Sequence, residues 1–275
     1  MSIVEALVLG VVQGLTEFLP VSSTAHLRVV PALLGWADPG VAYSAVIQLG
    51  SVLAVISYFW RDLWSIGSGS WSALRRKDLA DRDVRLLGAI LLGTLPICLL
   101  GLGMQPILEQ PNGPLRSLTV IGAASVVMGL LLFLSERVSK RQRGLDNMGA
   151  RDGLVVGLGQ AMALIPGCSR SGSTLTVALL LNMKRQDAAH FSFLLGVPAI
   201  TLSGLLELRH LLNAGIDQVG LTNLLVGLCA STAVSYLSIA WLLRFLQNHS
   251  TWLFIGYRLA FGVVVLALAV NQVIR

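Results

Sequence analysis

The sequence predicts an all-α integral membrane protein with six full transmembrane helices and two re-entrant helical hairpins in an inverted-topology repeat. Hydrophobic residues make up 55% of the chain and charged residues 12%, whereas soluble domains carry about 25% charged residues. The apolar segments are long enough for helices, and no series of short alternating segments indicates a β-barrel. Two segments are short and interrupted by proline and polar residues, which favours re-entrant hairpins at those places.

The first hairpin is expected over residues of about 2–35. Residues 2–19 are apolar and stop at Pro20, and a second apolar stretch follows at about 23–35. At 1.5 Å per residue, this second stretch is too short to cross a hydrocarbon core of about 30 Å. We therefore expect two short helices joined by a Pro- and Ser-rich turn, either buried in protein or lining a watery cavity.

The six full spans account for most of the remaining chain. They are expected at Val41–Trp60, Leu86–Leu108 and Ser117–Ser135, and at about 188–208, 221–245 and 251–272. The expected connections are a polar loop over 61–85, a short Pro-rich link over Glu109–Arg116 and a second basic loop over 136–152.

A second hairpin is expected over residues of about 153–183. A short arm, Gly153–Ile165, is broken at 166–174, and a second arm follows to about 183. Gln13 and Gln160 hold equivalent places before the two breaks, at an offset of about 147 residues. We interpret 1–275 as a single membrane domain with repeat cores at 1–60 and 153–208. In inverted repeats the binding site lies at mid-membrane, where the broken helices meet.

The distribution of charge predicts orientation. The net charge is +6, and basic residues gather in the loops 61–85 and 136–152. The positive-inside rule places these loops in the cytoplasm, so the first hairpin and both termini would face outside. Because this pattern accounts for the basic residues, we expect no nucleic-acid partner. Small residues such as Gly122–Ser125 could pack helices within one copy or between two, which leaves a homodimer open.

The second break has the composition of an anion site. Gly167 and Gly172 let the backbone approach a ligand, and successive N–H groups can form an anion nest. Arg170 can hold phosphate oxygens in a bidentate fork. Hydroxyl donors could complete the site, and the candidates are Ser169, Ser171, Ser173 and Thr174.

The first break adds groups for catalysis. Gln13 and Glu17 are four residues apart and share one helix face, so together they could bind a divalent cation. Ser23 or His26 can act as nucleophile, with the other group or Glu17 assisting proton transfer. Ser22 and Thr24 can cap the second arm or contact substrate, and they are the remaining hydroxyl candidates in this break.

Together the two breaks suggest a lipid phosphate substrate whose tail stays in the bilayer. This interpretation requires Ser23 and His26 to approach Arg170 despite their distance in sequence. Arg258 and Glu207 lie near the ends of spans, and we expect them to be interfacial rather than catalytic, although Arg258 could reach the cavity.

Both breaks resemble motifs of one known family, the undecaprenyl-diphosphate phosphatases of the bacitracin-resistance type. The first family motif, (E/Q)-x-x-x-E followed by P-V-S-S-T-x-H, is present as Gln13, Glu17 and the segment 20–26. The second, P-G-x-S-R-S-x-x-T, is present as the segment 166–174. The resemblance covers most of the chain. At the first position of the first motif, which can be Glu or Gln, this chain has the uncharged Gln13.

The resemblance implies hydrolysis of undecaprenyl diphosphate to the monophosphate and phosphate. It further implies recycling of the lipid carrier for peptidoglycan synthesis, bacitracin resistance, a Mg²⁺ or Ca²⁺ requirement, and a bacterial plasma-membrane location with an outward-facing site. If the roles of the family's motif residues hold at the matching positions of this sequence, the catalytic residues would be Glu17, Ser23, His26 and Arg170.

Two alternatives stay open on the residues alone. Either Ser23 or His26 could form the covalent phosphoenzyme. Inverted repeats with broken helices are also typical of transporters, so a polyprenyl-phosphate flippase is the alternative function.

Overall fold

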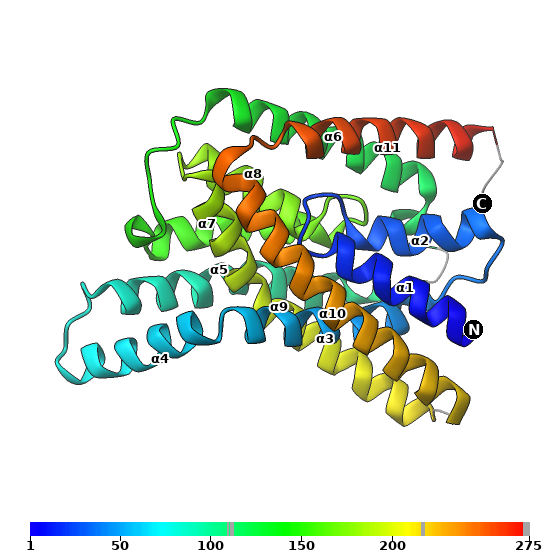
Figure 1. Cartoon of the computed structure of the whole chain (residues 1–275), viewed down its shortest axis with the longest axis horizontal. Coiled ribbons are helices and arrows are strands. Elements are labelled where there is room, and N and C mark those ends of the chain that lie inside the picture. Colours follow the sequence, from blue (N-terminus) through cyan, green and yellow to red (C-terminus); the bar gives the residue numbers. More distant parts are fainter. Residues whose placement is uncertain (109, 111–112, 216–217, 272–275) are drawn as a thin grey trace.

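The computed structural model describes residues 1–108, 110, 113–215 and 218–271, and these are almost entirely helical (Figure 1). Within this part of the chain, strand-like pairing is limited to one isolated bridge, between Arg143 and Met183. The α-helices are α1 (Ile3–Thr16), α2 (Ser23–Leu34), α3 (Gly40–Tyr58), α4 (Trp60–Arg75), α5 (Arg82–Leu108), α6 (Leu118–Val138), α7 (Ala150–Ala161), α8 (Arg170–Leu180), α9 (Arg185–Ala214), α10 (Gln218–Asn248) and α11 (Trp252–Val270).

Six of these helices are long and apolar enough to cross a membrane, namely α3, α5, α6, α9, α10 and α11. They coincide with the six predicted spans, which confirms an all-helical, multi-pass membrane protein. Residues 109, 111 and 112 of the predicted Pro-rich link, and residue 272 at the end of the last span, lie outside the described residues.

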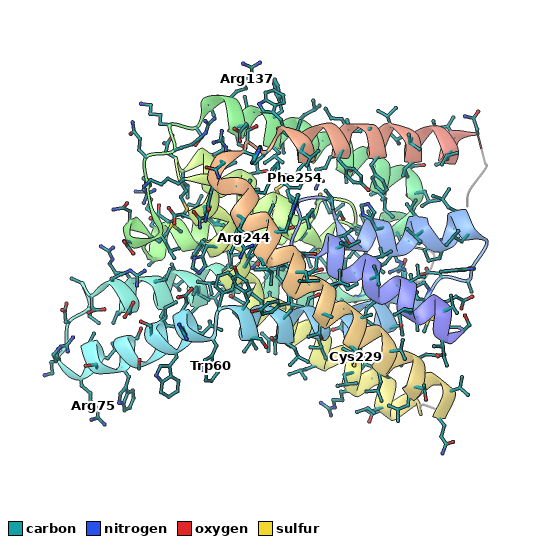
Figure 2. The ribbon with its side chains drawn as sticks, in the orientation of Figure 1. Trp60, Arg75, Arg137, Cys229, Arg244 and Phe254 are labelled. Carbon is teal, nitrogen blue, oxygen red and sulfur yellow. The ribbon has the colours of Figure 1, made fainter. Side chains whose placement is uncertain are left out.

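The prediction of a polar loop over 61–85 is wrong. Residues 60–75 form α4, and α5 begins at Arg82, four residues before its predicted start. The segment can form a helix because Ile66, Ser70 and Ala73 recur at helical spacing and are buried. Trp60 and Arg75, at the two ends of α4, point away from the bundle (Figure 2).

The short helices form two pairs, α1 with α2 and α7 with α8, and neither pair contains a full span. The first pair lies at the end of the molecule that carries the N-terminus, where the Asn223 side-chain amide of α10 donates to the Met1 carbonyl. The second pair lies toward the opposite end, and its break meets the first break near the centre (Figure 1).

Glycines allow these short helices to pack tightly against long ones. In α1, a Cβ at Gly10 would lie 2.5 Å from the Gly227 carbonyl oxygen of α10. In α7, a Cβ at Gly157 would collide with the backbone of Gly93 in α5. Each short helix therefore lies in backbone contact with the first half of a long helix, α1 on α10 and α7 on α5.

Buried and exposed ion pairs gather at the end of the molecule formed by the two basic segments. Glu136, with its side chain 2% exposed, pairs with Arg141 and Arg185 and accepts a hydrogen bond from Thr251 at 2.8 Å. Arg143 forms a two-pronged pair with Asp152, at 2.8 and 2.9 Å. Arg82 of the first basic segment pairs with Asp146 of the second, so the two segments predicted to share one side of the membrane lie at one end of the molecule.

The α7–α5 contact predicts opposite effects for two glycine substitutions. Gly157→Ala should lower the free energy of unfolding by about 1–3 kcal/mol, because overpacking forces the helices apart. Gly88→Ala in α5 is the matched control, since a Cβ added at Gly88 would meet no other atom within 4 Å. That change should be neutral or should stabilise by up to about 1 kcal/mol through helix propensity. Thermal unfolding in detergent measures both effects, and equal melting temperatures for the two variants would contradict the packing argument.

Candidate active site

The first break separates α1 from α2 and carries buried polar side chains. Its last residue, Ser22, has a φ of 76°, a left-handed conformation that costs about 1–2 kcal/mol for a residue with a side chain. The Ser22 side chain accepts a hydrogen bond from the Ala25 N–H at 3.4 Å, as an N-cap does. This cap starts α2 at Ser23 and places Ser23 in the first helical turn.

The second break repeats this conformation. Ser169 has a φ of 68°, and its side chain accepts from the Gly172 N–H at 3.1 Å. The predicted break at 166–174 is therefore too long, because the Ser169 cap starts α8 at Arg170 and makes 170–174 helical. Gly167 has a φ of 99° and lies so close to α6 that a Cβ would be 2.5 Å from the Ile121 carbonyl oxygen.

Glu17 connects the two breaks. Its Oε2 accepts hydrogen bonds from Ser23 Oγ at 2.6 Å and from Gln13 Nε2 at 2.9 Å. Its Oε1 lies 3.4 Å from Arg170 Nη2, with both side chains less than 10% exposed. The two breaks therefore meet at a buried ion pair that also holds a serine hydroxyl.

Arg170 is fixed from a third side by α9. Its Nη1 donates to the Ser192 carbonyl at 3.0 Å, and its guanidinium lies against Gly196, where a Cβ would collide with it. The Nε of Arg170 is buried and has no hydrogen-bond partner among the described residues. Gly196 thus makes the space in which the guanidinium turns toward Glu17.

His26 has partners other than Ser23. Its Nδ1 lies 2.7 Å from the Ser22 carbonyl, so this nitrogen carries the proton and donates it. Its Nε2 lies 2.6 Å from the Tyr257 hydroxyl, and the ring stacks on Phe261 with centroids 4.5 Å apart. The imidazole is therefore fixed in one tautomer when neutral, with Nε2 directed at α11.

The hydroxyl groups of the second break divide into two groups. Ser171 Oγ donates to the Leu19 carbonyl at 2.8 Å and so joins the breaks, and it also lies 3.2 Å from Ser169 Oγ. Ser173 and Thr174 are fully buried, and Thr174 Oγ1 donates to the Arg170 carbonyl at 2.8 Å. Thr174 Oγ1 also lies within hydrogen-bond distance of Ser192 Oγ and so joins α8 to α9, whereas the Thr24 side chain of the first break reaches a cavity.

Arg258 has a larger structural role than its place in the sequence predicts. We expected an interfacial residue that could reach the cavity, but Arg258 is 1% exposed and lies between the two breaks. It donates to the Pro20 carbonyl at 3.0 Å and to the Gly167 and Cys168 carbonyls at 2.8 and 3.1 Å. A buried arginine in an otherwise apolar span was the signal that could have identified it.

Gln13 and Glu17 are the candidate ligands of the predicted divalent cation. Gln13 Oε1 is buried without a hydrogen-bond partner in the described part of the chain, and it belongs to the side chain that contacts Glu17. One carboxylate and one amide oxygen are too few for a complete cage, and no group of three or more acidic, His or Cys side chains occurs in the described ranges. Mg²⁺ commonly takes one or two carboxylates and completes its shell with substrate phosphates and water.

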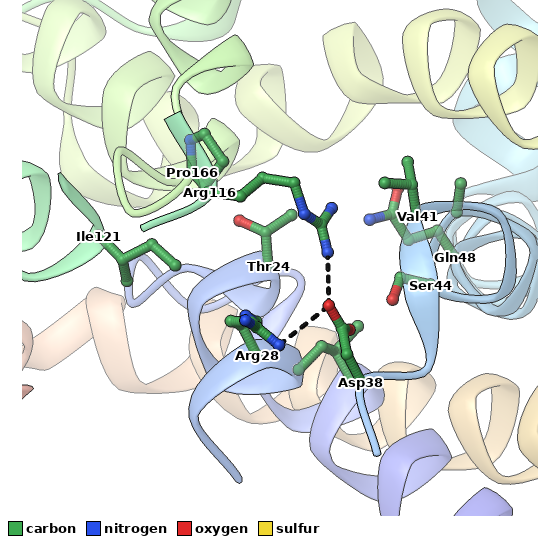
Figure 3. A pocket seen from close by; sticks show the side chains of 11 residues that line it. Thr24, Arg28, Asp38, Val41, Ser44, Gln48, Arg116, Ile121 and Pro166 are labelled. Atoms are coloured by element: carbon green, nitrogen blue, oxygen red, sulfur yellow. Dashed lines mark hydrogen bonds and ion pairs between the residues drawn. The ribbon is translucent and has the colours of Figure 1, made fainter. Parts of the chain in front are cut away.

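A cavity of about 120 Å³ lies beside the two breaks (Figure 3). Thr24 from the first break and Pro166 from the second line it, together with Ser44 and Gln48 of α3. Arg28, Asp38 and Arg116 lie together at this cavity and form ion pairs (Figure 3). Charged groups thus line a cavity that borders both breaks.

Arg258 donates to four carbonyl groups, since its Nε also reaches the Ser125 carbonyl at 3.4 Å. These bonds predict a large cost for replacing the guanidinium. Arg258→Lys retains the charge but loses the several directed donors of the guanidinium, so it should lower the free energy of unfolding by about 1–3 kcal/mol. Arg137→Lys is the control, because Arg137 stacks on Phe133 and Trp252 at the surface. Thermal unfolding in detergent measures both, and a melting temperature for Arg258→Lys as high as that of the control would contradict this role.

Comparison with known proteins gives consistent matches along nearly the whole chain. The family model described as "Bacitracin resistance protein BacA" matches residues 6–264. A protein of Gloeobacter violaceus named undecaprenyl-diphosphatase is 57% identical over 266 residues, which are 97% of this chain and 91% of that protein. Proteins of the same name from Nostoc sp. and Trichodesmium erythraeum are 54% and 48% identical, covering 97% and 100% of this chain and 83% and 88% of theirs. The chain therefore belongs to the bacitracin resistance protein BacA family.

Proposed function

We propose that this protein is an undecaprenyl-diphosphatase that hydrolyses undecaprenyl diphosphate to undecaprenyl phosphate and phosphate. One observation carries the assignment of the site: Ser23 Oγ donates to Glu17 Oε2 at 2.6 Å, and the same carboxylate pairs with Arg170. This arrangement supplies a nucleophile, a base and a phosphate-binding cation in one buried place. The names of the relatives support the same activity rather than a flippase.

In the mechanism we propose, Ser23 Oγ attacks the terminal phosphorus and its proton passes to Glu17 Oε2. The bond from that phosphorus to the bridging oxygen breaks, and undecaprenyl phosphate leaves with the bridging oxygen. Arg170 and the first N–H groups of α2 and α8 stabilise negative charge on the transferred phosphoryl group. Water then attacks the phosphoserine, Glu17 returns the proton to Ser23, and phosphate is released.

His26 is the internal alternative as nucleophile. Its Nε2 is the nitrogen that could form a phosphohistidine, but this nitrogen lies 2.6 Å from the Tyr257 hydroxyl. Ser23, in contrast, already donates its proton to a carboxylate. We therefore favour Ser23, with His26 held by Tyr257 to contact the phosphoryl group or position the water.

We also propose a divalent cation, Mg²⁺ or Ca²⁺, held by Glu17 and Gln13 Oε1 together with oxygens of the diphosphate. Such a cation would offset the charge of the diphosphate oxygens. The protein residues would orient it, since Gln13 contacts both Glu17 and Ser51 of α3. The remaining candidates for the diphosphate site are Ser22, Thr24, Gly167, Ser169, Ser171 and Gly172, with Ser173 and Thr174 in support.

The two breaks support an inverted-topology repeat with two re-entrant hairpins. Ser22 and Ser169 both have a positive φ, and each side chain caps its helix by accepting a hydrogen bond from the N–H three residues later. They stand at the same offset of about 147 residues as Gln13 and Gln160. The repeat cores would be 1–60 and 153–208, as the sequence predicts.

For location, we propose the bacterial plasma membrane, with the basic end of the molecule in the cytoplasm. The clustering of both basic segments at one end supports this orientation under the positive-inside rule. The cavity beside Thr24 would then open to the outer face, where the recycled lipid carrier is needed for wall synthesis. Hydrolysis there would also lower the amount of lipid diphosphate available to bacitracin. A homodimer stays a prediction.

Purified protein in detergent should release phosphate from farnesyl diphosphate. Ser23→Ala and Glu17→Gln should each lower kcat by at least about 100-fold, since a positioned base alone contributes about 10²–10⁴. Ser57→Ala is the control, because Ser57 is exposed and donates to the Leu53 carbonyl of its own helix. Rapid quenching of the wild type should trap an acid-stable phosphoserine. An acid-labile adduct would transfer the nucleophilic role to His26, and full activity in Ser23→Ala would contradict the mechanism.

The Tyr257 hydroxyl predicts a separate effect on turnover. Tyr257→Phe removes the hydrogen bond to His26 Nε2 but keeps the aromatic stack, so kcat should fall about tenfold while KM and the melting temperature change little. Tyr236→Phe is the control, because Tyr236 is 44% exposed and contacts the Tyr58 ring. Unchanged kcat in Tyr257→Phe would show that the orientation of His26 does not limit hydrolysis.

A further inference from the structure

The cavity beside the breaks carries an ion cluster that the mechanism does not use. Arg28 of α2 and Arg116, just before α6, both pair with the same oxygen of Asp38, Oδ2, at 3.0 and 3.1 Å (Figure 3). The three side chains are 19–27% exposed, so they are mostly withdrawn from solvent. Two guanidinium groups sharing a single carboxylate leave a positive charge in excess.

The hydrogen bonds of this cluster are incomplete. Arg28 Nε and Arg116 Nε are both buried and have no partner among the described residues. Glu207 lines the adjoining cavity with Arg116, but its Oε2 lies 3.7 Å from His210 Nδ1 and forms no ion pair with either arginine in the described ranges. A contact that merely fastened the loop before α3 would need only one arginine.

The position of the cluster relates it to the reaction. Arg28 follows Thr24 by one helical turn, so both lie on the same face of α2 and line the same cavity. Thr24 comes directly after Ser23, and Pro166 of the second break also lines this cavity. A phosphate group that moves between the breaks and this cavity therefore meets Arg28 and Arg116.

We propose that Arg28 and Arg116 form a second phosphate-binding site, at which an incoming diphosphate headgroup or a released phosphate displaces Asp38. Paired guanidinium groups bind tetrahedral oxyanions through several charge-assisted hydrogen bonds, whereas one Asp38 oxygen satisfies only part of that capacity. Asp38 is the resting counter-ion, which offsets two partly buried like charges when no phosphate is present. The proposal rests on the proposed function for the source of the phosphate.

The test measures binding of inorganic phosphate by equilibrium dialysis, in the Arg170→Gln background so that the central guanidinium does not contribute. Arg28→Gln and Arg116→Gln should each weaken phosphate binding about tenfold, and Asp38→Asn should strengthen it about tenfold. Arg75→Gln is the control, because Arg75 stacks on Trp71 of the exposed α4 surface. A gain of affinity in Asp38→Asn cannot come from misfolding. Wild-type-like phosphate affinity in all three cluster variants would overturn the proposal.

Turnover assays with the otherwise native chain separate the two sources of phosphate. If the KM for farnesyl diphosphate and the inhibition constant of phosphate both change about tenfold, the site receives the substrate headgroup. A change in the inhibition constant alone identifies a site for the released product. The dialysis result does not depend on hydrolysis, so an inactive wild-type protein would refute the proposed function while leaving the binding site to be judged by affinity.

Discussion

The structure depends on Arg258, which donates hydrogen bonds to carbonyl groups where two helices break inside an apolar bundle. Carbonyl groups in a break have no helical N–H partner, and each one left buried and unpaired costs about 1–3 kcal/mol. The guanidinium donates to Pro20 in one break and to Gly167 and Cys168 in the other. One side chain from α11 thus holds both breaks at once.

The buried charges at the centre also depend on one another. Glu17 and Arg170 lie in a place where either charge alone would be costly, since removing one partner of a buried pair commonly costs about 3–5 kcal/mol. Their contact is long, at 3.4 Å, while Ser23 and Gln13 hold the other carboxylate oxygen more closely. In the proposed mechanism, a substrate phosphate can therefore engage the guanidinium while Glu17 keeps its bond to the nucleophile.

The parts of the structure that depend on local pattern could be predicted from sequence. Apolar length located the six spans, and the polar interruptions located both breaks. The helix over residues 60–75 was missed because charged and tryptophan residues conceal its narrow buried face. The role of Arg258 and the bond from Tyr257 to His26 were missed because they join segments far apart in sequence. Periodicity along one segment contains no information about such partners, whereas motif resemblance identified Ser23 and Arg170 without showing that Glu17 joins them.

The proposed repeat explains why two similar breaks perform different chemistry. At the offset that relates Ser22 to Ser169, the first residue of α2, Ser23, corresponds to the first residue of α8, Arg170. Two helices with the same cap therefore present their N-termini, which favour anions, to one place. In the proposed mechanism, the shared backbone forms a phosphate site, and the divergent residues at its two equivalent positions make Ser23 the nucleophile and Arg170 the cation. Glu17, whose counterpart at that offset is Leu164, then connects the two halves into a single centre.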